Sequence, residues 1–125
     1  MSFNLFIVGL GSACGGISRY LVEGWVHQWS GSYFPYGTLV VNIVGSFLIG
    51  FLGTLFEGRF LVTPHQRLFL MIGVLGGFTT FSAFSFETWE LFKDGELLNA
   101  AFNVSLSLVG CLGGVFLGVV VARLI

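Results

Sequence analysis

The feature that most constrains this chain is its division into four long apolar stretches. They cover about residues 3–24, 37–57, 66–92 and 97–123, with short connections between them. A helix needs about 20 apolar residues to cross the roughly 30 Å hydrocarbon core of a bilayer. Each stretch meets that length. The sequence therefore predicts one all-α domain, residues 1–125, made of four antiparallel transmembrane helices.

Composition agrees with a membrane location and excludes several functional classes. Hydrophobic residues make up 55% of the chain and charged residues only 9%. The formal net charge is −1, so no basic face for nucleic acid is expected. No nucleophile–base pair, metal-ligand cluster or phosphate-binding loop is visible, and we expect no enzyme. Cys14 and Cys111 lie inside apolar stretches and are interpreted as small buried hydrophobes.

Lysine and arginine are almost evenly divided between the two sides of the predicted bundle. Four spans place both termini on one side, with Arg59, Arg67 and Arg123, whereas the other side carries Arg19 and Lys93. Orientation normally follows an excess of these residues on the cytoplasmic side. Two interpretations stay open: a noisy count in a small protein, or a chain that inserts both ways and forms an antiparallel homodimer.

The third apolar stretch is interrupted by small and hydroxyl-bearing residues. Residues 76–85 read Gly-Gly-Phe-Thr-Thr-Phe-Ser-Ala-Phe-Ser. Backbone that leaves the helix at bilayer depth must be buried in protein or line a wet cavity, because lipid offers no hydrogen bonds. We therefore expect a helix broken mid-membrane and a site there for an ion or small polar solute. Freed carbonyls would suit a hard cation such as Na⁺, whereas the positive edges of phenylalanine rings would suit an anion.

Polar residues also occur inside the second and fourth stretches. Asn42 lies near the start of the second, with Ser46 one turn further on the same face. The fourth carries a polar stripe at four-residue spacing: Asn99, Asn103, Ser107 and Cys111. Such residues either form interhelical hydrogen bonds, worth about 0.6–2 kcal/mol per pair, or mark the path of a permeating solute. Both interpretations stay open.

Glycines are spread through all four stretches. Gly11 and Gly15 in the first, and Gly110, Gly113 and Gly114 in the fourth, form small faces that allow close approach of helices. Four thin helices enclose little space, so a pore would need a second subunit.

Three motifs have a counterpart in a known family. They are Gly15 with Arg19, residues 37–42 (Gly-Thr-Leu-Val-Val-Asn), and residues 76–87, with the pattern Gly-Gly-Phe-Thr-Thr-Phe-Ser-x-Phe-Ser-x-Glu. Together they resemble the small dual-topology fluoride channels, the Fluc or CrcB family. The resemblance covers essentially the whole chain.

This resemblance implies a fluoride-selective channel that passively exports cytoplasmic fluoride across the cell inner membrane. The channel would be an antiparallel homodimer with two pores, its subunits inserted in both orientations among membrane lipid. A structural Na⁺ would lie centrally at the dimer interface, held by the backbone carbonyls of Gly76 and Thr79 of both subunits.

The resemblance also assigns roles to side chains. The anion pore would be lined by Asn42, Thr80, Phe81, Ser82, Phe84 and Ser107, with Asn103 as a further donor where the family often has an aromatic hydroxyl. Arg19 and Glu87 would be vestibule or structural residues. Two rival functions are a small dual-topology multidrug antiporter and a membrane assembly protein. The antiporter needs a carboxylate in the middle of the first span, and residues 3–18 contain none.

Overall fold

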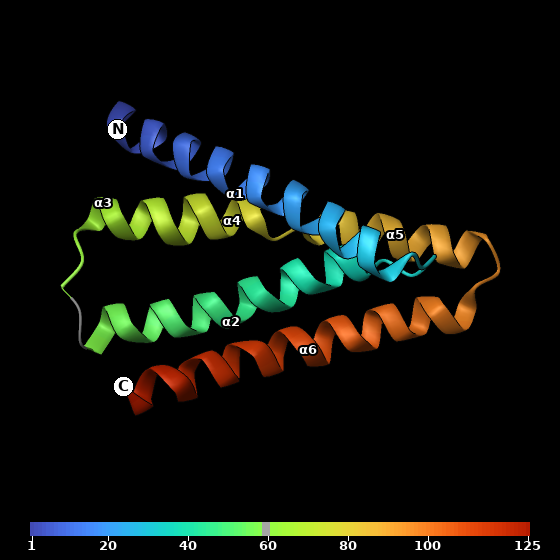
Figure 1. The fold of residues 1–125 in the computed structure, drawn as a ribbon. Helices are drawn as coiled ribbons and strands as arrows, with labels where there is room; N and C mark the ends of the chain where they lie inside the picture. The colour runs from blue at the N-terminus through green and yellow to red at the C-terminus, as the bar shows by residue number, and fades with distance from the viewer. Residues whose placement is uncertain (59–60) are drawn as a thin grey trace.

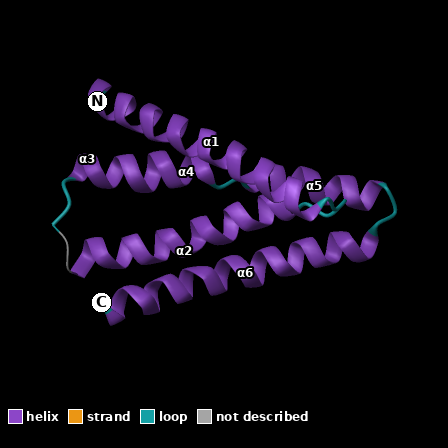
Figure 2. Ribbon diagram, viewed as in Figure 1, coloured by secondary structure: helices purple, strands orange, loops and turns teal. Residues whose placement is uncertain are grey.

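The computed structural model describes residues 1–58 and 61–125, and every regular element in that part of the chain is helical (Figures 1 and 2). Helices α1 (Ser2–Ser30), α2 (Tyr36–Gly58) and α6 (Leu97–Leu124) are continuous. The third span is built from α3 (Pro64–Arg67), the π-helical segment η1 (Leu68–Val74), α4 (Leu75–Phe78) and α5 (Phe81–Lys93).

Four segments of the described chain are long and apolar enough to cross a membrane. They are Ser2–Ser30, Tyr36–Gly58, Pro64–Lys93 and Leu97–Leu124, which confirms the four predicted spans. Both termini lie at the same end of the bundle, as an even number of spans requires (Figure 1). Arg59, used above in the charge count, lies outside the described residues.

Local signals fix where the helices begin and end. α1 continues past the predicted apolar stretch to Ser30 and ends at Gly31, whose φ of 52° is left-handed. The third span begins with a capping box, in which the Thr63 side chain accepts from the Gln66 amide and the Gln66 side chain accepts from the Thr63 amide. Gly95, with φ 77°, turns the chain between α5 and α6.

Glycine allows α1 to cross the third span at backbone contact. A Cβ on Gly11 would lie 2.6 Å from the Phe69 carbonyl oxygen and 2.8 Å from the Gly73 Cα, and one on Gly15 would overlap the Val74 carbonyl oxygen. The structure thus confirms Gly11 and Gly15 as a packing face.

A second glycine contact joins α2 to α6. A Cβ on Gly110 would lie 2.6 Å from Ile43 Cδ1, and one on Gly114 would lie 3.1 Å from the Ile43 carbonyl oxygen, whereas one on Gly113 would meet nothing within 4 Å. Gly110 and Gly114 therefore form this packing face, and Gly113 lies outside it.

The cysteine prediction is wrong for Cys14. Both cysteines are free, but Cys14 is exposed on the subunit and Cys111 is partly exposed. Only Gly11 and Gly15 of α1 are buried, so most of this helix faces outward. An apolar sequence in a membrane helix indicates contact with lipid as readily as burial in protein.

The two loops at one end of the bundle are tied together. The Tyr33 hydroxyl, between α1 and α2, donates to Asp94 Oδ2 at 2.8 Å, just after α5. This hydrogen bond and the nearby negative charge raise the pKa of Tyr33 above its ordinary value. The contact links the α1–α2 connection to the α5–α6 turn.

Candidate functional site

Two threonines divide the third span. Thr79 (φ −91°, ψ 157°) and Thr80 (φ −151°, ψ 117°) are extended, so α4 ends at Phe78 and α5 begins at Phe81. Thr80 caps α5, its Oγ1 accepting from the Ala83 amide at 3.2 Å. β-Branched residues favour extended backbone, and threonine is a good helix cap.

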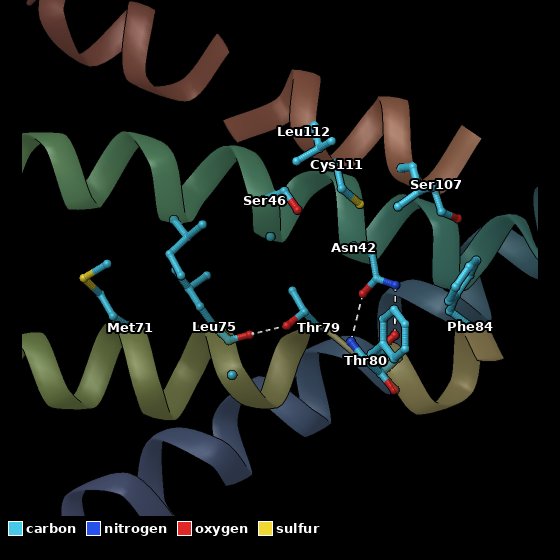
Figure 3. Close-up of a pocket in the computed structure, with 15 residues that line it drawn as sticks. Asn42, Ser46, Met71, Leu75, Thr79, Thr80, Phe84, Ser107, Cys111 and Leu112 are labelled. Carbon is cyan, nitrogen blue, oxygen red and sulfur yellow. Dashed lines mark hydrogen bonds between the residues drawn. The ribbon is translucent and has the colours of Figure 1, made fainter. Parts of the chain in front are cut away.

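Asn42 pairs with both backbone groups of Thr80 (Figure 3). Asn42 Nδ2 donates to the Thr80 carbonyl oxygen at 2.9 Å, and the Thr80 amide donates to Asn42 Oδ1 at 2.8 Å. One side chain of α2 therefore satisfies the peptide groups that the interruption leaves without helical partners. Of the two hydrogens on Asn42 Nδ2, one is used in this pair and the other is available.

The same pairing frees a carbonyl in α4. In a continuous helix the Thr80 amide would donate to the Gly76 carbonyl, but here it donates to Asn42. Among the described residues no other hydrogen bond to the Gly76 carbonyl replaces it. The next carbonyl, of Gly77, accepts from Arg19 Nε at 3.2 Å. Arg19 thus has a structural contact at the interruption, from α1.

A hollow of about 400 Å³ opens beside the interruption, between α2, α4, α5 and α6 (Figure 3). It is lined by most of the residues that the resemblance assigned to the ion sites: Asn42, Gly76, Thr79, Thr80, Phe81, Phe84 and Ser107. The remaining predicted residues, Arg19, Ser82, Asn103 and Glu87, do not line it. The fold therefore gathers the proposed cation and anion residues at one place.

Sequence reasoning did not single out Gly45, Leu75 or Met71, which also line the hollow. Gly45 is needed there, because a Cβ would overlap the Thr79 side chain. The sequence signal for Gly45 was its position three residues after Asn42, which places it on the same face of α2. Leu75 and Met71 are ordinary apolar residues of a membrane helix, and no sequence signal distinguishes them.

The two helix ends place partial charges of opposite sign on the two sides of the interruption. The first amide groups of α5 have no intrahelical acceptors, and they concentrate partial positive charge near Phe81. The last carbonyls of α4, by contrast, concentrate partial negative charge near Phe78. An anion is favoured on the α5 side of the interruption and a cation on the α4 side.

Phe81 and Phe84 form an aromatic pair on α5. Their ring centroids are 5.4 Å apart and their planes are inclined by 52°. Phe84 is partly buried, whereas Phe81 is 77% exposed on the subunit. This large aromatic side chain at the hollow is therefore free to contact lipid or another protein chain.

The polar stripe of α6 divides into two parts. Asn103, 1% exposed, donates from Nδ2 to Thr88 Oγ1 of α5 at 2.9 Å, and Asn99 donates to Glu96 at 3.1 Å. Ser107 and Cys111, further along, line the hollow. The interhelical interpretation therefore holds for Asn103, whereas Asn99 bonds locally and the role of Ser107 and Cys111 at the hollow stays a prediction.

Ser82 also has a local contact. Its Oγ lies 3.3 Å from Thr80 Oγ1, next to the hollow. It is exposed on the subunit surface.

The fold and site together define a small multi-pass membrane protein with a mostly apolar hollow, carrying a few polar groups, at an interrupted span. A family model described as "CrcB-like protein, Camphor Resistance (CrcB)" matches residues 6–119. The chain belongs to this family.

Several curated relatives carry the name "Fluoride-specific ion channel FluC". A protein of Methylocella silvestris is 53% identical over 90% of this chain and 88% of its own length. One of Opitutus terrae is 53% identical over 98% of this chain and 93% of its own length. One of Methylococcus capsulatus is 46% identical over 98% of this chain, which spans 54% of that relative.

Proposed function

We propose that this protein is a fluoride-selective ion channel that lets cytoplasmic fluoride leave the cell passively and so lowers its intracellular concentration. The observation that carries the proposal is the hollow at the interruption, where an amide, hydroxyls and two phenylalanine rings converge. The relatives named as fluoride channels support the same activity, and they are channels rather than enzymes.

The residues of the hollow suit a small, strongly hydrated anion. Such an ion enters a pore only where donors replace its water. The second Nδ2 hydrogen of Asn42 and the hydroxyl of Ser107 are available donors. The amino end of α5 adds favourable potential, and the ring edges of Phe81 and Phe84 add weak positive contacts. No described carboxylate lines this hollow to repel the anion.

The channel works as an antiparallel homodimer with two pores, in our proposal. The exposed Phe81 and the exposed Gly76, both at the hollow, leave a face of the single subunit open. The near-equal split of lysine and arginine allows both orientations in one membrane. We place the dimer in the cell inner membrane of a bacterium.

A structural Na⁺ at the dimer interface fits the α4 end. The Gly76 carbonyl has lost its helical amide partner, and Thr79 follows where the backbone turns extended. Carbonyl oxygens are hard ligands of the kind that such a cation prefers. Two carbonyls are too few for one ion, so a second subunit would complete the set. Bound there, the ion would supply positive charge that offsets the cost of removing fluoride from water.

This chain's own residues prepare that position. Asn42 holds the Thr80 amide away from the Gly76 carbonyl, and Arg19 occupies the Gly77 carbonyl. The Gly76 carbonyl is thereby left for a ligand.

The test is fluoride efflux from liposomes that contain the purified protein. We expect fast, electrogenic fluoride flux without a proton gradient, and little flux of chloride. A multidrug antiporter would instead need a proton gradient and a cationic drug, and an assembly protein would conduct nothing. Absence of fluoride flux from a well-folded dimer would contradict the proposal.

A further inference from the structure

A second, smaller cavity lies at the end of the bundle that holds the α1–α2 connection. Its volume is about 190 Å³, and its walls come from the last part of α1, the start of α2 and the middle of α5. Two carboxylates from different helices line it, Glu23 of α1 and Glu87 of α5, together with Thr38 of α2. It shares no residue with the larger hollow.

Each carboxylate has one oxygen that is buried and without a partner. The Thr38 hydroxyl donates to Glu87 Oε1 at 2.7 Å. Glu87 Oε2 and Glu23 Oε1 are shielded from solvent, and no described residue donates to either. If both groups were ionised, two anionic oxygens would lie in one cavity with nothing to neutralise them. Burial and like charge both oppose that state.

The neighbouring polar groups do not supply the missing donor. His27 and Tyr36 line the cavity, but neither forms a hydrogen bond or ion pair with a carboxylate in the described structure. Arg19, one turn before Glu23 on α1, donates to the Gly77 carbonyl instead. The pair therefore lacks a cationic partner on all three helices that enclose it.

Backbone packing holds the two carboxylates on this cavity. A Cβ on Gly37 would lie 3.2 Å from the Glu23 Cα, so α1 and α2 touch at this point. Glu23 is thus fixed beside Gly37, the residue before Thr38. Thr38 in turn fixes Glu87 by its hydrogen bond.

We infer that Glu23 and Glu87 form a proton-binding site, in which one proton is shared between Glu23 Oε1 and Glu87 Oε2, directly or through a water in the cavity. The proton satisfies both orphaned oxygens and leaves the pair with a single negative charge.

Glu23 and Glu87 lie close enough to the larger hollow for the shared proton to affect conduction. Thr38 lies one turn before Asn42 on α2, and Glu87 lies three residues after Phe84 on α5. The pair therefore stands next to the end of the larger hollow. Loss of the proton adds a negative charge there and opposes the approach of an anion. This consequence rests on the proposed function, whereas the shared proton does not.

Infrared spectroscopy of the purified protein in lipid tests the shared proton directly. At neutral pH we expect the C=O stretching band of a protonated carboxyl, which disappears as the pH is raised. Glu23→Gln and Glu87→Gln should each remove the band, because the remaining carboxylate then accepts from the new amide. Glu57→Gln, which changes an exposed carboxylate of α2, should leave it unchanged. A wild-type spectrum without the band, or a band that survives in both cavity variants, would overturn the inference.

Fluoride efflux measured at several pH values tests the consequence. Wild-type flux should fall as the pH rises, and Glu23→Gln should make it independent of pH. An equal pH dependence in both proteins would overturn the effect on conduction. If no protein conducts fluoride at any pH, the proposed function fails, and the infrared result still decides the shared proton.

Discussion

Asn42 and Thr80 exchange two hydrogen bonds between α2 and the interruption of the third span, at 2.9 and 2.8 Å. An amide side chain is suited to this task, because it carries a donor and an acceptor side by side, as a peptide group does. These two hydrogen bonds stabilise the extended backbone at Thr80. It also places Asn42 at the wall of the hollow through which we propose that fluoride passes.

Asn42→Ala should therefore impair both stability and conduction. It leaves the Thr80 amide and carbonyl without partners, at about 1–3 kcal/mol for each unsatisfied group. We expect a lower melting temperature in detergent and loss of most fluoride flux. Asn42→Asp should also lose flux, because a carboxylate cannot donate to the Thr80 carbonyl and repels an anion.

Asn99→Ala is the matched control. Asn99 donates only to the exposed Glu96, away from the interruption. Its removal should change stability by less than about 0.5 kcal/mol and leave flux near wild type. If Asn42→Ala conducts normally in a folded protein, Asn42 is not required in the anion path.

Phe81→Ile and Phe84→Ile should reduce conduction more than stability. Isoleucine keeps an apolar side chain but lacks the positive ring edge that a fluoride ion would contact. Phe81 is 77% exposed, so its replacement should change the melting temperature of the subunit less than replacement of Phe84 does. Flux and thermal unfolding, measured on the same preparations, separate the two effects. Normal flux in both variants would rule out a role for the rings in anion binding.

The sequence predicts the spans well and the details of the third span less well. Length and hydropathy define the four helices, because membrane insertion depends on little else. The interruption was expected within residues 76–85, and the structure narrows it to Thr79 and Thr80, which are extended, while Gly76 and Gly77 lie in α4. Only Gly77 serves packing: a Cβ there would lie 2.5 Å from the Ser12 carbonyl oxygen, whereas one on Gly76 would meet nothing within 4 Å.

Side-chain partners were harder to predict than side-chain positions. The motif of residues 76–87 located the hollow, but nothing in it shows that Asn42 binds the backbone of Thr80. Asn103 looked like a member of a continuous polar stripe, yet it donates to Thr88. The rotation of α6 about its axis decides whether Asn103 faces α5. Helical periodicity alone does not specify how one helix is rotated against another. The meeting of Glu23 and Glu87 at one cavity likewise depends on the contact between Gly37 and Glu23.

Antiparallel assembly predicts that each orientation is needed in one membrane. Adding two or three lysines to one side of the chain should fix the orientation, because the natural bias is so small. A variant fixed in one orientation should fold but fail to conduct fluoride when expressed alone. Co-expression with the oppositely fixed variant should restore flux. Full activity of a single variant, shown by accessibility labelling to insert only one way, would contradict the antiparallel dimer.

Gly76 and Gly77 are neighbours, but their substitutions should fail in different ways. Gly77→Ala places a Cβ against the backbone of Ser12 and should destabilise the subunit itself, by about 1–3 kcal/mol.

A Cβ on Gly76 would meet nothing within 4 Å, so Gly76→Leu should leave the subunit folded. If the Gly76 carbonyl faces a second copy and Na⁺, the leucine should prevent dimerisation and abolish flux. Analytical ultracentrifugation and melting curves with and without Na⁺ measure this. Thr79→Ser keeps the carbonyl and should retain a stabilisation by Na⁺ that Gly76→Leu lacks. A dimeric, conducting and Na⁺-stabilised Gly76→Leu protein would exclude the cation site at this carbonyl.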